Sequence, residues 1–411
     1  MTRHASHKVG DHAIERAILN LNKQLREETH GKAFLSAEQK HAIRHMAGSK
    51  QLALVVGVAG AGKTTIMAGA KEALEAQGYR VRGAAPSGVA AAALKECGIS
   101  ASTLHSLEAR IQLAQQMMDD NTGKPLTQGQ RDFINSAMLT NKDVLIVDEA
   151  GMVSAKQLSN ILQLCQQSGA KLVLVGDPAQ LQSIEAGAAF RSLIERNPHA
   201  RLDDVRRQHT DWQRLAMRHL SQGNVEQALQ AYDAKGCIQR ADTRSEAKAQ
   251  LVTDMMQARD NAPQHVTLVV AYTRADVADL NAIIKAEMVK RGHVSAKNTD
   301  IAVTAKDGET ETTEIQGFAV GDRIAFRENN RDIGVMNGTF GTLQSIDDGQ
   351  FCVKLDNGKN VTFSPQEYTR FQLGYAATVH QSQGMTVDRP FVLATPTPHA
   401  QQPPAGVLSN I

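Results

Sequence analysis

Cysteine and aromatic residues are scarce in this sequence of 411 residues. The four cysteines stand far apart, and none belongs to a CxxC pair or a Cys/His group with the spacing of metal ligands. They are Cys97, Cys165, Cys237 and Cys352. A disulfide framework is therefore not expected, and the thiols are those of a reduced, cytoplasmic protein. Aromatic residues amount to 4% of the chain, which is too few for a broad surface on which nucleic-acid bases stack.

An excess of one charge is also absent, because the formal net charge is +2 at pH 7. This balance excludes a histone-like basic protein and an acidic disordered one, so any contact with nucleic acid must come from local patches. Long hydrophobic runs are missing too. The longest, such as residues 52–56 and 266–272, have the length of a β-strand and not that of a membrane span. Residues 1–7 lack the apolar core of a signal peptide, and we expect a cytoplasmic protein without membrane contact.

The sequence does contain a regular alternation of apolar strands and helices. Short apolar runs predict buried strands over residues 52–56, 79–84, 143–147, 171–175 and 266–272. Helical segments are expected at residues 64–77, 88–96 and 275–290. Such alternation is typical of parallel sheets covered by helices, and the length of the chain suggests two or three domains. The predicted fold class is therefore α/β.

Four segments depart from this alternation. Residues 1–34 are polar with an apolar stripe at helical spacing, which predicts an N-terminal helical arm. Residues 107–141 are polar and rich in glutamine, and they predict a helical insert. Residues 301–363 contain short alternating strands separated by glycine-containing turns, which predicts a small antiparallel insert. Residues 396–411 contain four prolines, and we expect them to be a disordered tail.

The strongest single motif is the glycine-rich segment GVAGAGKTT at residues 57–65. It matches G-x-x-x-x-G-K-[ST], follows an apolar strand and opens a helix, which is the context that a phosphate-binding loop requires. Its glycines allow backbone N–H groups to approach phosphates, and the helix N-terminus adds a favourable dipole. Lys63 is expected to reach the β- and γ-phosphates of ATP, and Thr64 to bind Mg²⁺. The residues predicted to bind the nucleotide are Gly57, Gly60, Gly62, Lys63, Thr64 and Thr65.

Two further strands end in polar residues that suit nucleotide hydrolysis. The run at 143–147 is followed by Asp148 and Glu149, at the edge where parallel sheets bind ligands. Asp148 suits a Mg²⁺ site and Glu149 suits a base that orients the attacking water. An acidic pair here could also be a helix cap, but the phosphate loop favours the catalytic interpretation. Gln180 follows the strand at 171–175 and could sense the γ-phosphate, although the adjacent Asp-Pro pair could be only a turn.

Three weaker signals each have a structural alternative. Ser36 and Gln39 form a capping-box pattern, and Gln39 could instead contact the edge of adenine. Arg207 could belong to a solvated arginine pair, or it could stabilise charge in the transition state of phosphate cleavage. Clusters of short polar donors at 86–88, 102–105 and 378–384 suit phosphate contacts. Each cluster taken alone is better explained as the start of a helix.

Taken in order from about residue 35 to residue 393, these segments resemble the motifs of superfamily 1 DNA helicases of the RecD-like branch. The set is most similar to the motor portion of conjugative relaxase-helicases of the TraA and TraI type. The resemblance implies two RecA-like lobes with ATP between them. The first lobe would span residues 35–204 with a helical insert at about 107–141, and the second residues 205–395 with a small β-barrel-like insert at about 301–363. It also implies an enzyme that hydrolyses ATP and moves 5′→3′ on single-stranded DNA during conjugative transfer.

The resemblance implies a role for each matching residue. Gln39 would read adenine, Gln180 would sense the γ-phosphate and Arg207 would be an arginine finger. The catalytic residues would be Lys63, Asp148, Glu149, Gln180 and Arg207, with Mg²⁺ held by Thr64 and Asp148. The contacts to DNA would come from Pro86, Ser87, Thr103 and His105 in the first lobe and from Asn337, Thr378, His380 and Gln381 in the second. The implied partners are single-stranded DNA and other proteins of conjugation or of the relaxosome.

Two features of the family's pattern are missing from this sequence. Relaxases carry a nicking tyrosine and a metal-binding histidine cluster. The histidines near the start, His4, His7 and His12, lack that pattern, so no nicking activity is expected and a solvated arm is predicted for them. The family also has a motif ending in Ala-Leu-Ser/Thr-Arg shortly after residue 393, where this chain becomes proline-rich. The alternative to a motor is therefore a truncated module that binds nucleotide and DNA with little hydrolysis.

Overall fold

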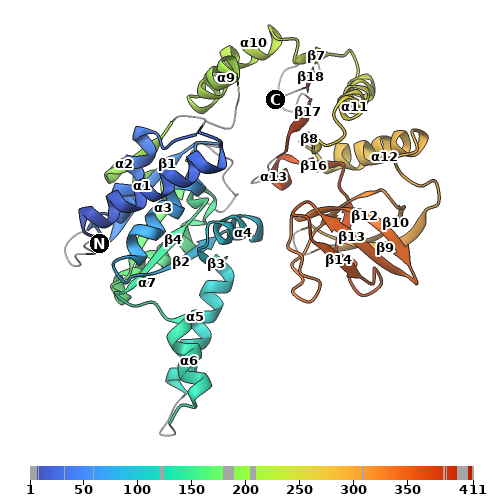
Figure 1. Cartoon of the computed structure of the whole chain (residues 1–411). Coiled ribbons are helices and arrows are strands. Elements are labelled where there is room, and N and C mark those ends of the chain that lie inside the picture. The colour runs from blue at the N-terminus through green and yellow to red at the C-terminus, as the bar shows by residue number, and fades with distance from the viewer. Residues whose placement is uncertain are drawn as a thin grey trace. The chain divides into compact units, whose positions relative to one another are not determined.

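The computed structural model describes residues 7, 9–31, 33–58, 60–120, 125–178, 189–203, 210–307, 310–382, 385, 387–395 and 406–409. They form two compact units, Met1–Asn224 and Val225–Ile411, and most of their elements are labelled in Figure 1. Each unit has sheets and a hydrophobic core of its own. Within the described residues, no helix combines the length and the hydropathy that a membrane span requires.

The first unit is built on a six-stranded parallel sheet. Its strands are β1 (Leu52–Gly57), β2 (Arg80–Ala85), β3 (Ser100–Thr103), β4 (Asp143–Val147), β5 (Lys171–Gly176) and β6 (His199–Leu202). Their spatial order is β3-β2-β4-β5-β1-β6, and every neighbouring pair is parallel. Every residue of β4 and β5 is buried, as expected for parallel strands with helices on both faces. The predicted α/β fold is confirmed, and the carboxyl ends of all six strands lie at one edge.

Helices cover both faces of this sheet. They are α1 (Asp11–Glu28), α2 (Ala37–Ala47), α3 (Lys63–Glu75), α4 (Gly88–Glu96), α5 (Leu104–Asp119), α6 (Gln128–Ala137), the 3₁₀ turn η1 (Ala150–Met152), α7 (Ala155–Ser168), α8 (Ala189–Arg196) and α9 (Asp211–Ser221). Alternate residues of β4 belong to two different core clusters: Val144 and Ile146 pack with α1 to α4, and Leu145 and Val147 pack with α5, α7 and α8. This alternation places the clusters on opposite faces of the sheet. The single tryptophan of the chain, Trp212, lies in α9.

The N-terminal helix belongs to the core of the first unit. The apolar stripe of α1 is buried and includes Ile14, Ile18 and Leu21. His7, just before the helix, is 2% exposed, and its ring lies 5.6 Å from the ring of Tyr79, centroid to centroid. The prediction of a solvated histidine arm is therefore wrong for His7, because packing of the apolar stripe on α3 also covers the residues before it. His12 is exposed, and His4 lies outside the described residues.

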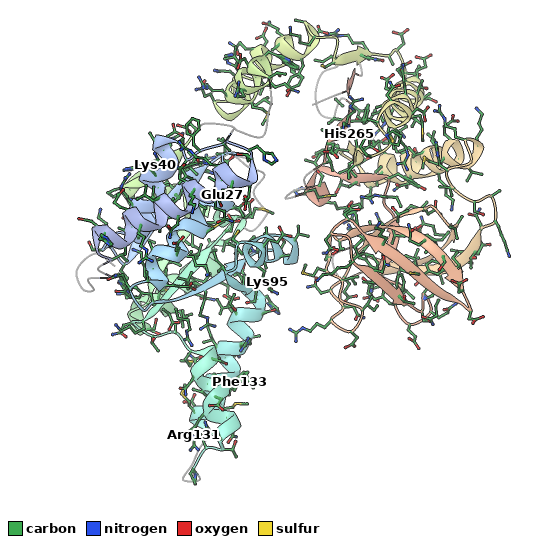
Figure 2. The ribbon with its side chains drawn as sticks, viewed as in Figure 1. Glu27, Lys40, Lys95, Arg131, Phe133 and His265 are labelled. Atoms are coloured by element: carbon green, nitrogen blue, oxygen red, sulfur yellow. The ribbon has the colours of Figure 1, made fainter. Side chains whose placement is uncertain are left out.

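The helices α5 and α6 form the helical insert that the polar sequence predicts. They pack on each other through a small cluster of Ala114, Ile134 and Ala137. The guanidinium of Arg110 lies 5.7 Å from the centre of the Phe133 ring, and Figure 2 labels Phe133 on α6. The first part of α5 packs on the sheet through Leu104, Leu107 and Ile111, whereas this small cluster joins the rest of α5 to α6.

The second unit has a mixed five-stranded sheet. The strands β16 (Ala376–Thr378), β8 (Thr267–Ala271) and β17 (Arg389–Ala394) are parallel, and β18 (Gly406–Ser409) and β7 (Ile238–Arg240) continue the sheet as antiparallel strands. Its helices are α10 (Val225–Asp233), α11 (Arg244–Asn261), α12 (Arg274–Lys290) and the short α13 (Val379–Ser382). The predicted strand at 266–272 and helix at 275–290 are therefore both confirmed.

The C-terminal tail contains a strand that the sequence does not predict. The backbone of β18 pairs with both β17 and β7. The four residues of β18 have the sequence GVLS, and the prolines that favour disorder all precede them. The expectation of disorder over 396–411 is therefore wrong for residues 406–409. The prolines themselves lie outside the described residues.

The antiparallel insert of the second unit consists of a long hairpin and a five-stranded sheet. The hairpin pairs β9 (Thr299–Asp307) with β10 (Thr310–Phe318). The sheet contains β11 (Arg323–Phe326), β12 (Phe340–Asp347), β13 (Gln350–Leu355), β14 (Asn360–Phe363) and β15 (Phe371–Leu373), in the order β14-β13-β12-β11-β15. Asp348 and Gly349 both have positive φ angles, which the Asp-Gly turn between β12 and β13 requires. The few aromatic residues of the chain gather here, and rings of Phe318, Phe326, Phe351, Phe363, Tyr368 and Phe371 pack on one another.

One buried carboxylate joins α12, the antiparallel insert and β16. Asp322 is fully buried and accepts hydrogen bonds from Lys285 Nζ, from the Tyr375 hydroxyl and from the Ala319 N–H, each at 2.7 Å. Lys285 Nζ also donates to the carbonyl of Gly317 at 2.6 Å. Burial and then the charge of Asp322 raise the pKa of the Tyr375 phenol, so the hydroxyl remains a donor. Asp322 therefore holds three elements of the second unit together.

Replacing Asp322 with alanine is expected to destabilise the second unit by about 3–5 kcal/mol, because it leaves the Lys285 ammonium buried without its partner. Urea unfolding followed by circular dichroism measures the change. The matched control is Asp356→Ala, which removes an ion pair with Arg323 that is partly exposed, and it should cost less than about 1 kcal/mol. An equal loss in both variants would contradict this role of Asp322.

Candidate active site

The phosphate loop connects β1 to α3. Gly57 ends the strand and Lys63 is the first residue of the helix. Gly60 and Gly62 both have φ angles of +81°, a backbone conformation that side chains other than glycine rarely adopt. A Cβ atom at Gly57 would lie 3.1 Å from Lys63 Cγ, so the lysine side chain lies directly against this glycine. The loop therefore directs the first N–H groups of α3 and the Lys63 side chain towards one place, as anion binding requires.

The two hydroxyl residues of the motif lie on the first turn of α3. Thr64 is exposed, and Thr65 is half-buried. The predicted positions of Gly57, Gly60, Gly62, Lys63 and the two threonines are therefore brought together as one loop and one helix start. Ala59, within the loop, lies outside the described residues.

The Lys63 ammonium meets the predicted carboxylate pair. Its Nζ lies 3.4 Å from Glu149 Oε2 and 3.5 Å from Oε1, although the two residues are far apart in the sequence. Both side chains are largely buried, with 10% of the lysine and 18% of the glutamate exposed. The parallel sheet explains the contact, since β1 and β4 both pair with β5 and their carboxyl ends share one edge. The structure thus brings together two of the residues that the sequence selected for catalysis.

The backbone at Glu149 is in the left-handed region, with a φ angle of +51°. This conformation costs energy in a residue other than glycine and persists only where the surrounding structure enforces it. Glu149 ends the turn after β4 and immediately precedes η1. Sequence patterns do not report φ angles, so the sequence selects Glu149 as a candidate base but gives no sign of its strained backbone.

Asp148 is buried at the end of β4. Its Oδ1 accepts a hydrogen bond from the Glu149 N–H at 2.9 Å. Burial and then the charge of Glu149 raise the pKa of Asp148 to about 6. A buried carboxylate beside a second carboxylate is the arrangement that favours binding of a hard cation, because the cation offsets both charges.

The raised pKa means that the ionised form of Asp148 weakens the fold. The unfolded side chain ionises near its ordinary value of 3.8 and the folded one at about 6. The cost is therefore absent below about pH 4 and fully present above about pH 6. Asp148→Asn should raise the free energy of unfolding at pH 8 by about 1–3 kcal/mol, and urea titrations should show that this gain vanishes at pH 4.

Asp143, at the other end of β4, is the matched control for this prediction. Burial acts to raise its pKa, but hydrogen bonds from Arg80 and Thr140 hold the pKa below its ordinary value. Asp143→Asn should therefore lose stability at pH 8, in contrast to Asp148→Asn. If both variants lose stability at that pH, the proposed electrostatic cost at Asp148 is absent.

Two glycines that the sequence did not select hold the carboxylate turn against β5. A Cβ atom at Gly151 would lie 2.5 Å from the carbonyl oxygen of Asp177. A Cβ atom at Gly176 would lie 2.9 Å from the backbone nitrogens of both Ala150 and Gly151. The turn after β4 can pack this closely only because neither glycine has a side chain. Gln180 follows this segment and lies outside the described residues, as does Arg207.

Gln39 contacts the phosphate loop and also caps α2. Its Oε1 accepts from the Ser36 N–H at 3.0 Å, and its backbone N–H donates to Ser36 Oγ, which completes the capping box. Its Nε2 donates to the carbonyl of Ala61 at 3.1 Å. Gln39 is 4% exposed, and its amide lies against Gly62. The capping box is thus present, and both atoms of the amide are engaged within the protein.

A cavity of about 640 Å³ lies in the first unit, next to the start of α2. Its lining comes from α2, from α9 and from the ends of β1, β5 and β6, and it includes Glu38, Val58, Asp177, Arg201 and Arg218. Glu38 Oε2 accepts a hydrogen bond from the Asp203 N–H at 2.9 Å, which joins two of its walls. Its volume is in the range of small-molecule sites, and Val58 places it beside the phosphate loop.

In the first unit, the residues that the resemblance implies in DNA binding lie at the carboxyl edge of the same sheet. Pro86 and Ser87 follow β2, and Thr103 and His105 lie at the end of β3, which pairs with β2. Ser87 and Thr103 both act as N-caps, accepting from the N–H groups of Ala90 and Ser106. Ser87 and His105 are exposed. The sheet therefore brings these four residues to one surface, while two of their hydroxyls also perform the capping role that the local pattern predicts.

In the second unit, the residues that the resemblance implies in DNA binding lie at the end of β16, in α13 and in the antiparallel insert. Thr378 and Gln381 bond reciprocally: the Thr378 N–H donates to Gln381 Oε1 at 3.1 Å, and the Gln381 N–H donates to Thr378 Oγ1 at 3.3 Å. His380 between them is exposed. Asn337 is exposed, and its N–H donates to Asn329 Oδ1 at 2.8 Å.

Comparisons with known proteins agree with this arrangement. A protein-family model described as an AAA domain matches residues 34–243, just over half of the chain. The chain is 38% identical over 399 residues to the probable conjugal transfer protein TraA of Sinorhizobium fredii, a match that covers 96% of this chain and 32% of TraA. It is 27% identical over 355 residues to the ATP-dependent RecD2 DNA helicase of Deinococcus radiodurans, covering 85% of this chain and 44% of that protein. The chain thus spans about a third of the length of its TraA relatives.

Solved structures show the same fold. The crystal structure of a Pif1 helicase from Bacteroides in complex with ADP-AlF3 and ssDNA aligns with a TM-score of 0.57 at 20% identity, and the match covers 89% of this chain and 88% of that one. The shared architecture is an α/β fold with a parallel sheet behind the phosphate loop and with antiparallel insertions. The chain belongs to the AAA domain family, is a homologue of the conjugal transfer protein TraA and of RecD, and has the fold seen in Pif1 helicase structures.

Proposed function

We propose that this chain is an ATP-driven motor that moves 5′→3′ along single-stranded DNA and acts in conjugative transfer. The observation that carries the proposal is the position of Lys63 in a glycine-rich loop. Its Nζ lies 3.4 Å from Oε2 of Glu149, a residue whose backbone is strained. The names of its relatives, a conjugal transfer protein and an ATP-dependent DNA helicase, support the choice of substrate and process. Other proteins of conjugation or the relaxosome are the proposed partners.

The phosphate loop and the carboxylate turn divide the chemistry of hydrolysis between them. When ATP binds, Lys63 leaves Glu149 for the β- and γ-phosphates, and the N–H groups at the start of α3 contact the same oxygens. Glu149 is then free to accept a proton from the water that attacks the γ-phosphorus. The bond from that phosphorus to the bridging oxygen of ADP breaks, and ADP and phosphate are released. The resting ion pair thus keeps both groups near the positions in which they act.

The residues present fit a Mg²⁺ ion that enters with the nucleotide. Within the described residues, no group of three or more His, Cys, Asp and Glu side chains could hold a metal alone. Asp148 and the exposed Thr64 hydroxyl supply oxygen donors of the kind that Mg²⁺ prefers, and the phosphates would supply the others. When bound, the ion would offset charge on the phosphate oxygens. Gln180 and Arg207 are proposed as the γ-phosphate sensor and the arginine finger, and Gln39 as an adenine contact.

The test is the rate of ATP hydrolysis with and without oligo-dT. A motor should show a low rate alone and a rate raised by at least about tenfold when saturated with DNA. Displacement of streptavidin from either end of a biotinylated oligonucleotide then measures direction, and we expect displacement only from the 3′ end. Binding of ATP and DNA without stimulated hydrolysis would favour the alternative, a binding module with little turnover.

A further inference from the structure

A groove of about 1160 Å³ lies within the second unit. It is bounded by α12, by the β9–β10 hairpin and by residues that follow β11 and precede β15. Thr378 and Gln381, two of the residues implied in DNA binding, line it together with Arg274 and Arg327. Neither arginine belongs to a sequence motif, so sequence patterns alone do not select them.

The charges in this groove leave one arginine without a carboxylate. Arg370 pairs with Glu311 at 2.7 Å and with Glu328 at 3.1 Å. Lys285 pairs with Asp322, as described above. Among the ion pairs of the described residues, none includes Arg327, which is partly buried. Burial and then the positive charge of Arg274 lower the pKa of the Arg327 guanidinium. A cation held next to a second cation, with limited access to water, is costly unless an anion binds there.

The backbone places Arg327 beside Asn337, another second-unit residue that the resemblance implies in DNA binding. Phe326, at the end of β11, exchanges hydrogen bonds with the segment after Asn337. The Phe326 N–H donates to the Thr339 carbonyl, and the Gly338 N–H donates to the Phe326 carbonyl, each at 2.9 Å. Arg327 is the next residue in the chain. The segment at 337–339 is thus adjacent to Arg327. Arg327, Thr378 and Gln381 line the same groove.

We propose that Arg327 binds a backbone phosphate of single-stranded DNA in this groove, with Arg274 as a second positive charge. This inference rests on the proposed function, because it concerns the same DNA strand. A guanidinium offers two parallel donors that match two phosphate oxygens, and a phosphate would supply the anion that Arg327 lacks. The β9–β10 hairpin contributes the carboxylates of Glu311 and Glu314 to the lining of the groove, and carboxylates repel phosphates. The strand therefore lies on the side of α12 and β16, where Thr378 and Gln381 are.

The experiment compares Arg327→Gln with Arg331→Gln in the full chain. Both changes remove one positive charge, but Arg331 is exposed and does not line the groove. Fluorescence anisotropy of a labelled oligo-dT measures Kd over a range of salt concentrations. Arg327→Gln should raise Kd by about tenfold or more, and it should reduce the slope of log Kd against log salt by about 0.7, the value for one phosphate of a single strand. Arg331→Gln should change Kd by less than about twofold.

Thermal unfolding without DNA separates a binding role from a structural one. Because Arg327→Gln removes an unpaired charge, its Tm should equal or exceed that of the wild type, whereas loss of a structural contact would lower Tm. Arg327→Lys should restore the salt slope and part of the affinity. If wild-type chain binds oligo-dT and Arg327→Gln binds it as Arg331→Gln does, the inference is overturned and the proposed function stands. If wild-type chain does not bind oligo-dT at any salt concentration, both are overturned.

Discussion

Replacing Glu149 with glutamine is expected to lower the rate of ATP hydrolysis by about 10²- to 10⁴-fold. Glutamine has almost the same size and shape, but its amide cannot accept the proton of the attacking water. Glu149 has a φ angle of +51°, and this backbone conformation costs a glutamine as much as a glutamate, so we expect the change to add no new strain. The rate should be measured at saturating ATP and oligo-dT, where only the chemical step and later steps are compared.

ATP binding should survive in Glu149→Gln, or become tighter. Lys63 loses the carboxylate that lies 3.4 Å away and is then available to the phosphates at no cost. Equilibrium titration with a fluorescent ATP analogue measures this affinity. The control is Glu195→Gln, an exposed position on α8, which should match the wild type in both assays. Hydrolysis by Glu149→Gln at the control rate would show that another group is the base.

Truncation of Lys63 to alanine should remove binding and hydrolysis together. Charged hydrogen bonds to the phosphates are lost, which predicts an ATP affinity about 10- to 100-fold weaker, and the hydrolysis rate should fall to background. Lys95→Ala is the matched control, since Lys95 is exposed on α4, where Figure 2 labels it. Retention of ATP affinity in Lys63→Ala would mean that this loop does not hold the phosphates.

Lys63→Ala and Glu149→Gln therefore test the two members of the Lys63–Glu149 ion pair separately. Lys63→Ala removes the group that binds phosphate, and Glu149→Gln removes the group that accepts the proton. A contact that was only structural would give two variants with the same loss of stability and the same partial loss of activity. Opposite effects on ATP affinity are expected here, and only the chemical roles of the pair explain them.

The strands β1, β4 and β5 of the first unit could be predicted because they are mostly apolar runs, whereas β3 and β6 are short and partly polar and were not predicted. The strand at 143–147 and the helix at 88–96 have the predicted limits. The meeting of Lys63 and Glu149 could also be expected, since the carboxyl ends of parallel strands share an edge. Where a β-barrel-like insert is predicted, the structure has a hairpin and a five-stranded antiparallel sheet.

Other features depend on contacts that no local pattern reports. The bond from Gln39 Nε2 to the Ala61 carbonyl joins two segments far apart in the chain, and only the fold brings them together. The close approach of Gly151 and Gly176 is of the same kind. Arg327 is one of several basic residues in the antiparallel insert, and it is distinguished only by the charges that surround it. His7 was predicted on the surface, because one histidine in a polar stretch gives no sign that a neighbouring ring covers it.

Trp212 has a practical consequence for kinetic work. It is the only tryptophan in the chain, it is half-buried in α9, and α9 is the last helix before the boundary between the two units at Asn224. Intrinsic emission on selective excitation therefore originates from a single point beside that boundary. Stopped-flow mixing with nucleotide or oligo-dT can follow events there in real time, without an attached dye and without engineering the polypeptide.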